Sequence, residues 1–179
     1  MPEWMVKGEA LSDYLQACKD ADLTTVETDK VLMKMFNTPE QYQTVMKRLV
    51  ELFGPLDGMR ICEIGGGYGG QAKAIFSSYN PILYHIIDLP EVCELQQHYL
   101  WLLPVGCYDS VPIGYIYDLV ISNYALSEIP DNKYYIDEVL RKSKHGYITC
   151  NTDLVKLDFP HSCMADIPGE RRTNYVLYW

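Results

Sequence analysis

In the first half of the chain, apolar residues follow first the spacing of a helix and then the pattern of a strand, a turn and a second helix. Between residues 39 and 53 apolar side chains recur every three or four positions, as on a helix with one buried face, and Gly54 follows where a helix would end. A short apolar run spans residues 60–64, glycines crowd into residues 65–70, and an amphipathic segment continues to Phe76. The pattern predicts a helix, a strand, a tight turn and a second helix, in that order.

Strand and helix patterns keep alternating downstream. Further strands are expected at 82–88, 105–110, 117–123 and 145–151, the third leading into a loop, and helices at 90–103 and 132–143. This alternation is typical of an α/β fold, in which a parallel sheet carries helices on both faces. Two strand-like runs at 161–168 and 173–179 predict a closing antiparallel hairpin. Upstream, residues 12–23 and 27–36 are expected to form two shorter helices.

The length of the chain favours one domain rather than two. A chain of 179 residues with 48% hydrophobic content can bury one sizeable core. We expect residues 1–56 to form a small N-terminal helical cap or lead-in and residues 57–179 to form the ligand-binding core. The six cysteines are dispersed without C-x-x-C spacing, so reduced thiols are expected rather than a zinc site or a redox pair.

Charge and hydropathy limit the expected partners. The net charge is −9 and no stretch collects lysines or arginines, which argues against nucleic acid and against an anionic membrane surface. A small neutral or cationic ligand is expected instead. The first residues are acidic where a signal peptide needs a basic flank, and no apolar run approaches about 18 residues. We therefore expect a soluble, cytoplasmic protein.

The glycine-rich turn fits two nucleoside-binding patterns. Gly65, Gly67 and Gly70 match a dinucleotide fingerprint, whereas Glu63 with Gly65, Gly67 and Gly69 matches the acid-x-Gly-x-Gly-x-Gly turn of methyltransferases. A carboxylate before the turn opposes a pyrophosphate at the helix N-terminus, but it suits the ammonium and sulfonium groups of S-adenosylmethionine. Glu63 favours the methyltransferase interpretation, and a nicotinamide-dependent sugar reductase is the alternative.

Polar residues at the ends of the other strands extend this candidate site, because ligands of such sheets bind beyond the carboxyl ends of the strands. Asp88 is positioned to accept hydrogen bonds from both ribose hydroxyls, and Leu89 follows it in the same pocket. Asp109 would accept from the adenine amine, while a backbone N–H near Ser110 would donate to the ring. Further cofactor contacts are expected at Asn123 and Tyr124, after the fourth core strand, and at Tyr68 in the turn.

Three segments carry a family resemblance: EIGGGYGGQAKAI, IIDLPEV with the following LQQHYL, and YDLVISNYALSEI. Together they resemble the sugar O-methyltransferase family, a branch of the class I S-adenosylmethionine-dependent methyltransferases. The resemblance covers residues 58–151, and IPGERRTNYVLYW is similar to the family's terminal strands. It implies a Rossmann-like sheet of seven strands, mostly parallel with the last strand antiparallel. S-adenosyl-L-methionine is the implied cofactor, and S-adenosyl-L-homocysteine is the implied product.

The resemblance also implies a methyl acceptor, partner domains and a cellular location. The acceptor would be a sugar hydroxyl on a glycan or on a nucleotide-linked deoxysugar such as rhamnose. The chain is similar in size to methyltransferase domains of larger glycan-building proteins, such as those of large algal viruses. Glycosyltransferase domains are then expected as fused or associated partners, in the host cytoplasm if the protein is viral. The segment after Asn151 is shorter than in the family, which predicts a short or missing helix there.

Methyl transfer to a sugar hydroxyl needs a group that removes a proton, because the hydroxyl is a poor acid. Glu128 is the first candidate for this base, since it follows the fourth strand at the ligand edge, although it could instead cap the next helix. Asp153 and His161 are the other candidates, and His85 is expected in the core. No spacing indicates a metal site. Because the segment after Asn151 is short, a non-catalytic nucleoside-binding module is a third interpretation.

Overall fold

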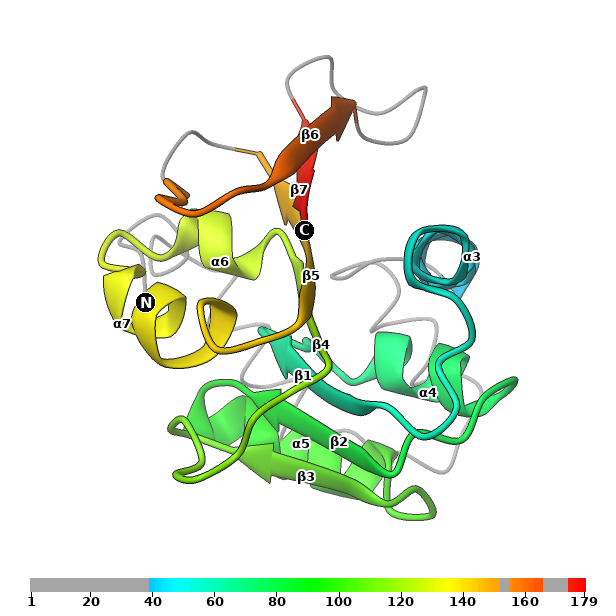
Figure 1. Ribbon diagram of the computed structural model, residues 1–179. Helices are drawn as coiled ribbons and strands as arrows, with labels where there is room; N and C mark the ends of the chain where they lie inside the picture. Colours follow the sequence, from blue (N-terminus) through cyan, green and yellow to red (C-terminus); the bar gives the residue numbers. More distant parts are fainter. Residues whose placement is uncertain (1–38, 152–154, 166–173) are drawn as a thin grey trace.

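The computed structural model describes residues 39–151, 155–165 and 174–179, which fold around one seven-stranded sheet (Figure 1). The strands are β1 (Arg60–Ile64), β2 (Leu83–Ile87), β3 (Val105–Tyr108), β4 (Leu119–Asn123), β5 (His145–Cys150), β6 (Ser162–Ala165) and β7 (Tyr175–Tyr178). The helices are α3 (Pro39–Phe53), α4 (Gly70–Phe76), α5 (Pro90–Tyr99), α6 (Ala125–Glu128), α7 (Lys133–Tyr135) and the π-helix η1 (Ile136–Leu140).

The sheet has the strand order β3-β2-β1-β4-β5-β7-β6. β1 pairs in parallel with β2 and β4, and the parallel pairing continues outward to β3 and β5. β7 runs antiparallel to both of its neighbours, β5 and β6. The α/β fold, the mostly parallel sheet and the antiparallel closing hairpin predicted from the sequence are thus confirmed.

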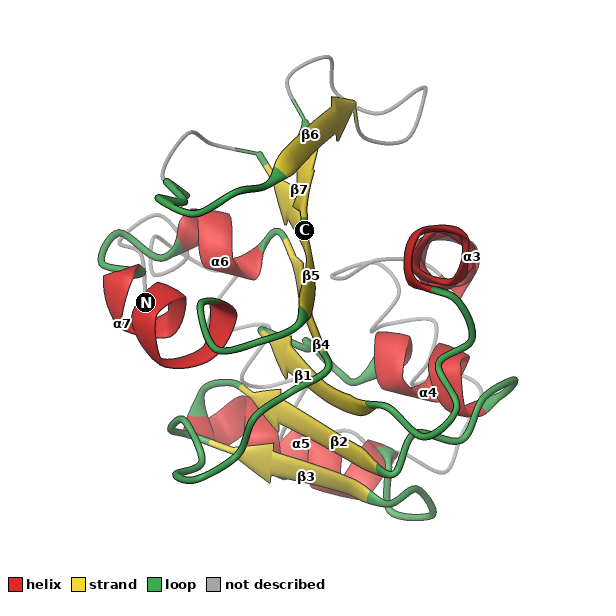
Figure 2. Cartoon of the chain, in the orientation of Figure 1, coloured by secondary structure: helices red, strands yellow, loops and turns green. Residues whose placement is uncertain are grey.

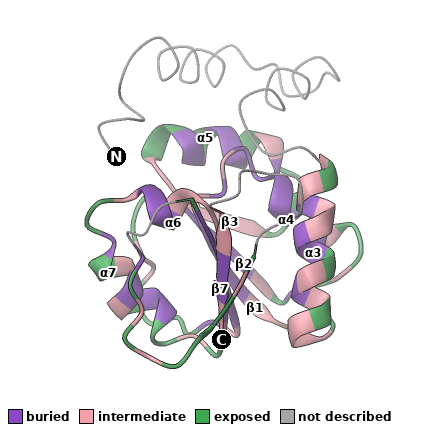
Figure 3. Ribbon diagram, turned by 90° about the horizontal axis from the view of Figure 1, so that it is seen from above, coloured by how far each residue is buried: buried purple, intermediate pink, exposed green. Residues whose placement is uncertain are grey.

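Helices cover both faces of the sheet and bury two separate hydrophobic layers (Figure 2). On one face α3, α4 and the end of α5 pack against alternate strand residues, among them Ile61, Tyr84 and Ile121. On the other face α6 and η1 pack against strand residues that point the opposite way, such as Cys62 and Val120. Figure 3 shows the buried strands between these two layers. The period-2 alternation of strand side chains explains why one strand serves both layers.

Helix α3 is part of the main core. Its residue Leu49 is completely buried, and Leu56, just after the helix, is buried as well. Of the cap or lead-in predicted over residues 1–56, the segment 39–53 packs in the core of the sheet. The two helices expected upstream of residue 39 lie outside the described residues.

Two local elements differ from the sequence-based expectation. The segment after β4 forms the short helix α6 where a loop was expected, and the next helix changes from α to π at Ile136. Between β5 and β6, residues 155–161 contain no helix, which agrees with the predicted shortening of this connection. Of the described cysteines, none forms a disulfide, as expected from their spacing.

Candidate functional site

The glycine turn after β1 is held in a backbone conformation that favours glycine. Gly65, Gly67 and Gly69 have φ angles of 74°, 55° and 97°, and L side chains rarely adopt such angles. At Gly65 space is also lacking, because an added Cβ would lie 2.0 Å from the Cβ of Ala125 at the start of α6. The turn after β1 therefore closes directly against the segment after β4.

Asp88 lies immediately after β2 and its carboxylate is bound into this turn. Its Oδ2 accepts a hydrogen bond from the backbone N–H of Gly67 at 3.2 Å, and its Oδ1 accepts from the N–H of Leu89 at 2.9 Å. Gln96 Nε2 donates to Oδ2 at 3.0 Å. Burial raises the pKa of Asp88 to about 6 in spite of these donors. The backbone N–H of Gly66 also acts on this carboxylate and lowers its pKa, and since a carboxylate offers about four acceptor positions, little capacity is left for a ligand.

Glu63 is buried beneath the turn rather than exposed at the ligand edge. Its side chain is 1% exposed, and Tyr84 Oη donates to Glu63 Oε2 at 2.9 Å. Burial raises the pKa of Glu63 to about 8, with the nearby Asp88 charge adding to the effect. Glu63 therefore holds its proton near neutral pH. The attraction between a carboxylate and a cationic ligand, expected from the sequence, is therefore weaker.

The end of β4 contributes Asn123 and Tyr124. Asn123 Nδ2 donates to the buried Gln71 Oε1 at 3.3 Å, while Asn123 Oδ1 is buried and has no hydrogen-bond partner among the described residues. Tyr124 has a φ of 69° and is the only residue other than glycine with a positive φ in the described ranges. Its backbone N–H is held by the Thr149 Oγ1 at 2.9 Å. Strained residues of this kind concentrate at functional sites.

Glu128, in the segment after β4, is hydrogen-bonded to the residue that follows β5. It is 9% exposed, and Asn151 Nδ2 donates to its Oε1 at 2.7 Å. Asn151 in turn accepts from Ser127 Oγ at 2.9 Å. Burial raises the pKa of Glu128, while the hydrogen bond from Asn151 opposes this shift. The alternative that Glu128 caps the next helix is not seen, because its described partner belongs to the end of β5.

The other residues predicted to contact the cofactor differ in their exposure to solvent. Tyr68 is 3% exposed and packs edge to face against the rings of Tyr42 and Tyr99. Asp109 and Ser110 are exposed after β3, where Ser110 Oγ donates to Asp109 Oδ1 at 3.2 Å. The pair is thus accessible to a ligand, whereas the Tyr68 ring contributes to packing beneath the turn.

Of the other two base candidates, His161 lies away from Glu128. His161 is exposed and bonds through Nδ1 to the carbonyl oxygen of Phe159 at 2.8 Å. Ser162 pairs with Tyr178, which pairs with Tyr147 near the start of β5, so His161 lies at the edge opposite the strand ends that carry Asp88 and Glu128. The hairpin direction therefore moves His161 away from the candidate site. Asp153 lies outside the described residues.

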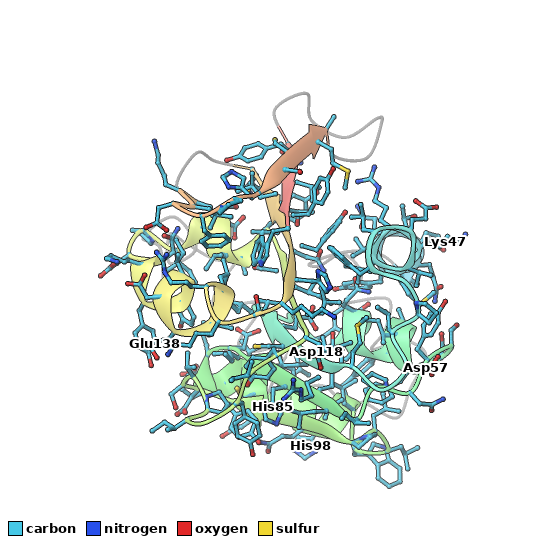
Figure 4. All side chains as sticks on the ribbon, in the orientation of Figure 1. Lys47, Asp57, His85, His98, Asp118 and Glu138 are labelled. Carbon is cyan, nitrogen blue, oxygen red and sulfur yellow. The ribbon has the colours of Figure 1, made fainter. Side chains whose placement is uncertain are left out.

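The histidine expected in the core is found there. His85 on β2, labelled in Figure 4, is 3% exposed, and its Nδ1 lies 3.0 Å from Tyr117 Oη. Within residues 39–151, 155–165 and 174–179 no cluster of His, Cys, Asp and Glu could hold a metal ion. In those same residues, no helix is long and apolar enough to cross a membrane.

Sequence reasoning missed two buried glutamines that organise the site. Gln71 and Gln96 are both 0% exposed, and they contact Asn123 and Asp88 respectively. The only available signal was that each polar residue falls on the apolar side of a helical pattern. Gln96 also donates to the carbonyl oxygen of Gly67 at 2.7 Å.

Comparison with known proteins gives a family match. The family model of the O-methyltransferase domain matches residues 5–104, which is more than half of the 179-residue chain. A search of curated protein sequences finds no match.

Solved structures with the same fold include several methyltransferases. Magnesium protoporphyrin IX methyltransferase (ChlM) from Synechocystis PCC 6803, with bound S-adenosylmethionine, has a TM-score of 0.64 at 14% identity, covering 97% of this chain and 92% of that chain. A mutant of MtNAS in complex with S-adenosylmethionine has a TM-score of 0.61 at 15% identity, covering 94% and 70%. A chain from the complex of the Haloferax volcanii Trm112 methyltransferase activator with a methyltransferase has a TM-score of 0.57 at 18% identity, covering 78% and 60%.

Proposed function

The chain belongs to the O-methyltransferase domain family, and from this premise we propose that it transfers a methyl group from S-adenosylmethionine to a sugar hydroxyl. The observation that carries the proposal is the contact between Asp88, after β2, and the glycine turn after β1, beside the boundary of β1 and β4 where the strand order reverses. This is where α/β folds bind nucleosides. A nicotinamide-dependent reductase is not supported by the family match.

The described residues fit the cofactor. The turn at Gly65, Gly67 and Gly69 lets a ligand approach the backbone closely. To accept from a ribose hydroxyl, Asp88 would exchange one of its present donors, and the longest of its contacts is the 3.2 Å bond from Gly67. The partnerless Asn123 Oδ1 offers a further acceptor at the end of β4. We assign the adenine amine to Asp109, which is exposed after β3.

We propose Glu128 as the base that accepts the proton of the acceptor hydroxyl. When bound, S-adenosylmethionine supplies a methyl carbon activated by the positive sulfonium. Glu128 would accept the hydroxyl proton as the oxygen attacks, with its carboxylate oriented by Asn151. Its raised pKa strengthens it as a base relative to an exposed glutamate. Asp153 is the second candidate for this role.

The choice of a sugar as acceptor rests on the sequence resemblance to the sugar O-methyltransferase family. A glycan-terminal or nucleotide-linked deoxysugar, such as rhamnose, is the proposed acceptor, and glycosyltransferase domains are the proposed partners. The cytoplasm is the proposed location. The solved structure of ChlM is named for a porphyrin substrate instead, so the acceptor must be tested directly.

Calorimetric titration with S-adenosylhomocysteine, beside NADH as a control, tests the cofactor assignment. We expect binding of S-adenosylhomocysteine alone, followed by methyl transfer to rhamnose-containing acceptors. Binding without turnover on any acceptor would favour a nucleoside-binding module. Binding of NADH alone, or of neither ligand, would overturn the proposal.

Asp88→Ala should weaken S-adenosylhomocysteine binding by about 1–3 kcal/mol, or roughly 5- to 150-fold, because a charged acceptor is lost from a buried set of hydrogen bonds. Glu91→Ala is the matched control, since Glu91 is an exposed acid in the first turn of α5. Calorimetry on both variants measures the difference. Equal affinity in Asp88→Ala and in the wild type would refute the ribose assignment.

A further inference from the structure

Gln96 on α5 is a buried amide that the proposed chemistry does not itself require. It is 0% exposed, and its Nε2 donates to the carbonyl oxygen of Gly67 at 2.7 Å and to Asp88 Oδ2 at 3.0 Å. Each partner belongs to a different element: Gly67 lies in the turn after β1, and Asp88 follows β2. One side chain therefore joins α5 to both parts of the nucleoside site.

The orientation of this amide is determined by its neighbours. Both partners of Nε2 are acceptors, so the flipped orientation would bring the Gln96 carbonyl oxygen against two other oxygens. In the observed orientation Gln96 Oε1 is buried and finds no partner in the described part of the chain. A buried acceptor without a partner is unfavourable, and methionine would fill the same space without one. Packing alone does not explain an amide at this position.

The glycine turn is shaped to receive this side chain. A Cβ added at Gly66 would lie 3.3 Å from Gln96 Nε2 and 2.6 Å from Ile86 Cγ2. The missing side chain at residue 66 therefore lets Gln96 reach both Gly67 and Asp88. This contact adds a second reason for glycine in the turn, beside the positive φ angles of its neighbours.

We propose that Gln96 is a positioning residue for cofactor binding, which holds the Asp88 carboxylate and the glycine turn in the arrangement that receives the ribose. The proposal rests on the proposed function, because it concerns the same nucleoside site. Gln96 acts through Asp88 and Gly67. Its loss should therefore affect cofactor affinity much more than the rate of methyl transfer at saturating cofactor.

The pH dependence of cofactor affinity reports the ionisation of Asp88. It therefore distinguishes a positioning role of Gln96 from a merely structural role, which would leave this pH dependence unchanged. Burial raises the pKa of Asp88, and the donor from Gln96 is one of the groups that lower it. Cofactor affinity should fall as the pH drops through this pKa, because a protonated Asp88 accepts less well from ribose. Without the Gln96 donor the fall should begin at a higher pH. The other titratable groups that respond to the charge of Asp88 are Glu63 on β1, Cys93 on α5, Cys107 on β3 and Tyr135 on α7.

Gln96→Met tests the proposal, with Gln97→Met as the matched control on the exposed side of the same helix. S-adenosylhomocysteine affinity should fall about 5- to 30-fold in Gln96→Met. The acid midpoint of its pH dependence should rise by roughly half to one pH unit. Gln97→Met should match the wild type in both measurements, and kcat in Gln96→Met should change less than about 2-fold.

The outcomes separate this proposal from the proposed function. A wild-type protein that does not bind S-adenosylhomocysteine removes the proposed function and this proposal with it. Wild-type binding together with unchanged affinity and midpoint in Gln96→Met overturns this proposal alone. A lower melting temperature with an unchanged midpoint also overturns it, because Gln96 would then act only in stability.

A second variant keeps the test decisive if Gln96→Met does not fold. Gln96→Glu preserves the length of the side chain but sets a new carboxyl beside Asp88. Once both groups are ionised they repel each other, so S-adenosylhomocysteine should bind this variant more weakly at about pH 8 than at about pH 6.5. That order is the reverse of the one expected for the wild type. A pH dependence equal to that of the wild type would overturn the proposal.

Discussion

Glu63→Gln should remove much of the loss of stability that the wild-type protein shows as the pH rises from about 5 to 8. Glu63 has a pKa of about 8 in the folded protein, chiefly because it is buried, against 4.5 for an ordinary glutamate. A raised pKa means that the folded state holds a proton that the unfolded state releases. The contribution to stability is therefore complete below about pH 4.5 and is lost as the pH rises through 8.

The size of the effect follows from linkage. One proton bound only by the folded state changes the free energy of unfolding by at most about 1.4 kcal/mol per pH unit. Between pH 5 and 8, the wild type should thus lose up to about 4 kcal/mol relative to Glu63→Gln. The amide keeps an oxygen for the Tyr84 hydroxyl, so the contact need not be broken. Urea denaturation at several pH values measures the two slopes.

Two further variants control this experiment. Glu51→Gln changes an exposed glutamate of α3 and should leave the wild-type slope intact. Tyr84→Phe removes the hydroxyl whose hydrogen bond lowers the pKa of Glu63, so the decline in stability should extend to a higher pH. Parallel slopes in Glu63→Gln and in the wild type would show that Glu63 is ionised in the folded protein throughout this range.

The sequence predicted the strands and the turn that form the site because each of these elements has its own local pattern of apolar and polar residues. The runs that became β1, β2 and β4 are short apolar segments, and each is followed by a polar or glycine residue at the ligand edge. Asp88 and the glycine turn could be found in this way without knowledge of strand order. The weak run at 105–110 was also predicted as a strand, and it forms β3 over Val105–Tyr108.

The pairing of residues could not be predicted in the same way. Burial raises the pKa of Glu63, and the hydrogen bond that it accepts from Tyr84 depends on the register between β1 and β2. Gln96 reaches Gly67 only because α5 folds back over the turn. The location of His161 depends on the direction of the last hairpin. These contacts arise from packing between segments that are distant in the sequence. The periodicity within one segment does not predict them.

Two local misreadings have a different cause. The four residues of α6 are too few to show a helical period, so the segment resembles a loop in sequence. The change from α to π at Ile136 depends on which carbonyl each N–H selects. Both elements matter for the site, since α6 ends at Glu128 and fixes its position beside Asn151.

Glu128→Gln should reduce kcat by about 100-fold or more, because an amide cannot take the proton of the acceptor hydroxyl. S-adenosylhomocysteine affinity should stay within about 2-fold of the wild type, since the cofactor contacts assigned above lie on other residues. The amide retains an oxygen for the hydrogen bond from Asn151, so the fold around α6 should persist. Release of S-adenosylhomocysteine with rhamnose-containing acceptors measures the rate.

The pH profile makes this prediction specific to a base. Burial raises the pKa of Glu128, and a base must be deprotonated to act, so wild-type kcat should fall as the pH drops through that pKa. The residual activity of Glu128→Gln should lack this acid limb. Glu138→Gln is the matched control, because Glu138, labelled in Figure 4, is exposed and pairs with Lys142 on the surface. An unchanged kcat in Glu128→Gln would transfer the role of base to Asp153, and Asp153→Asn would then be the variant expected to lose both the rate and the acid limb.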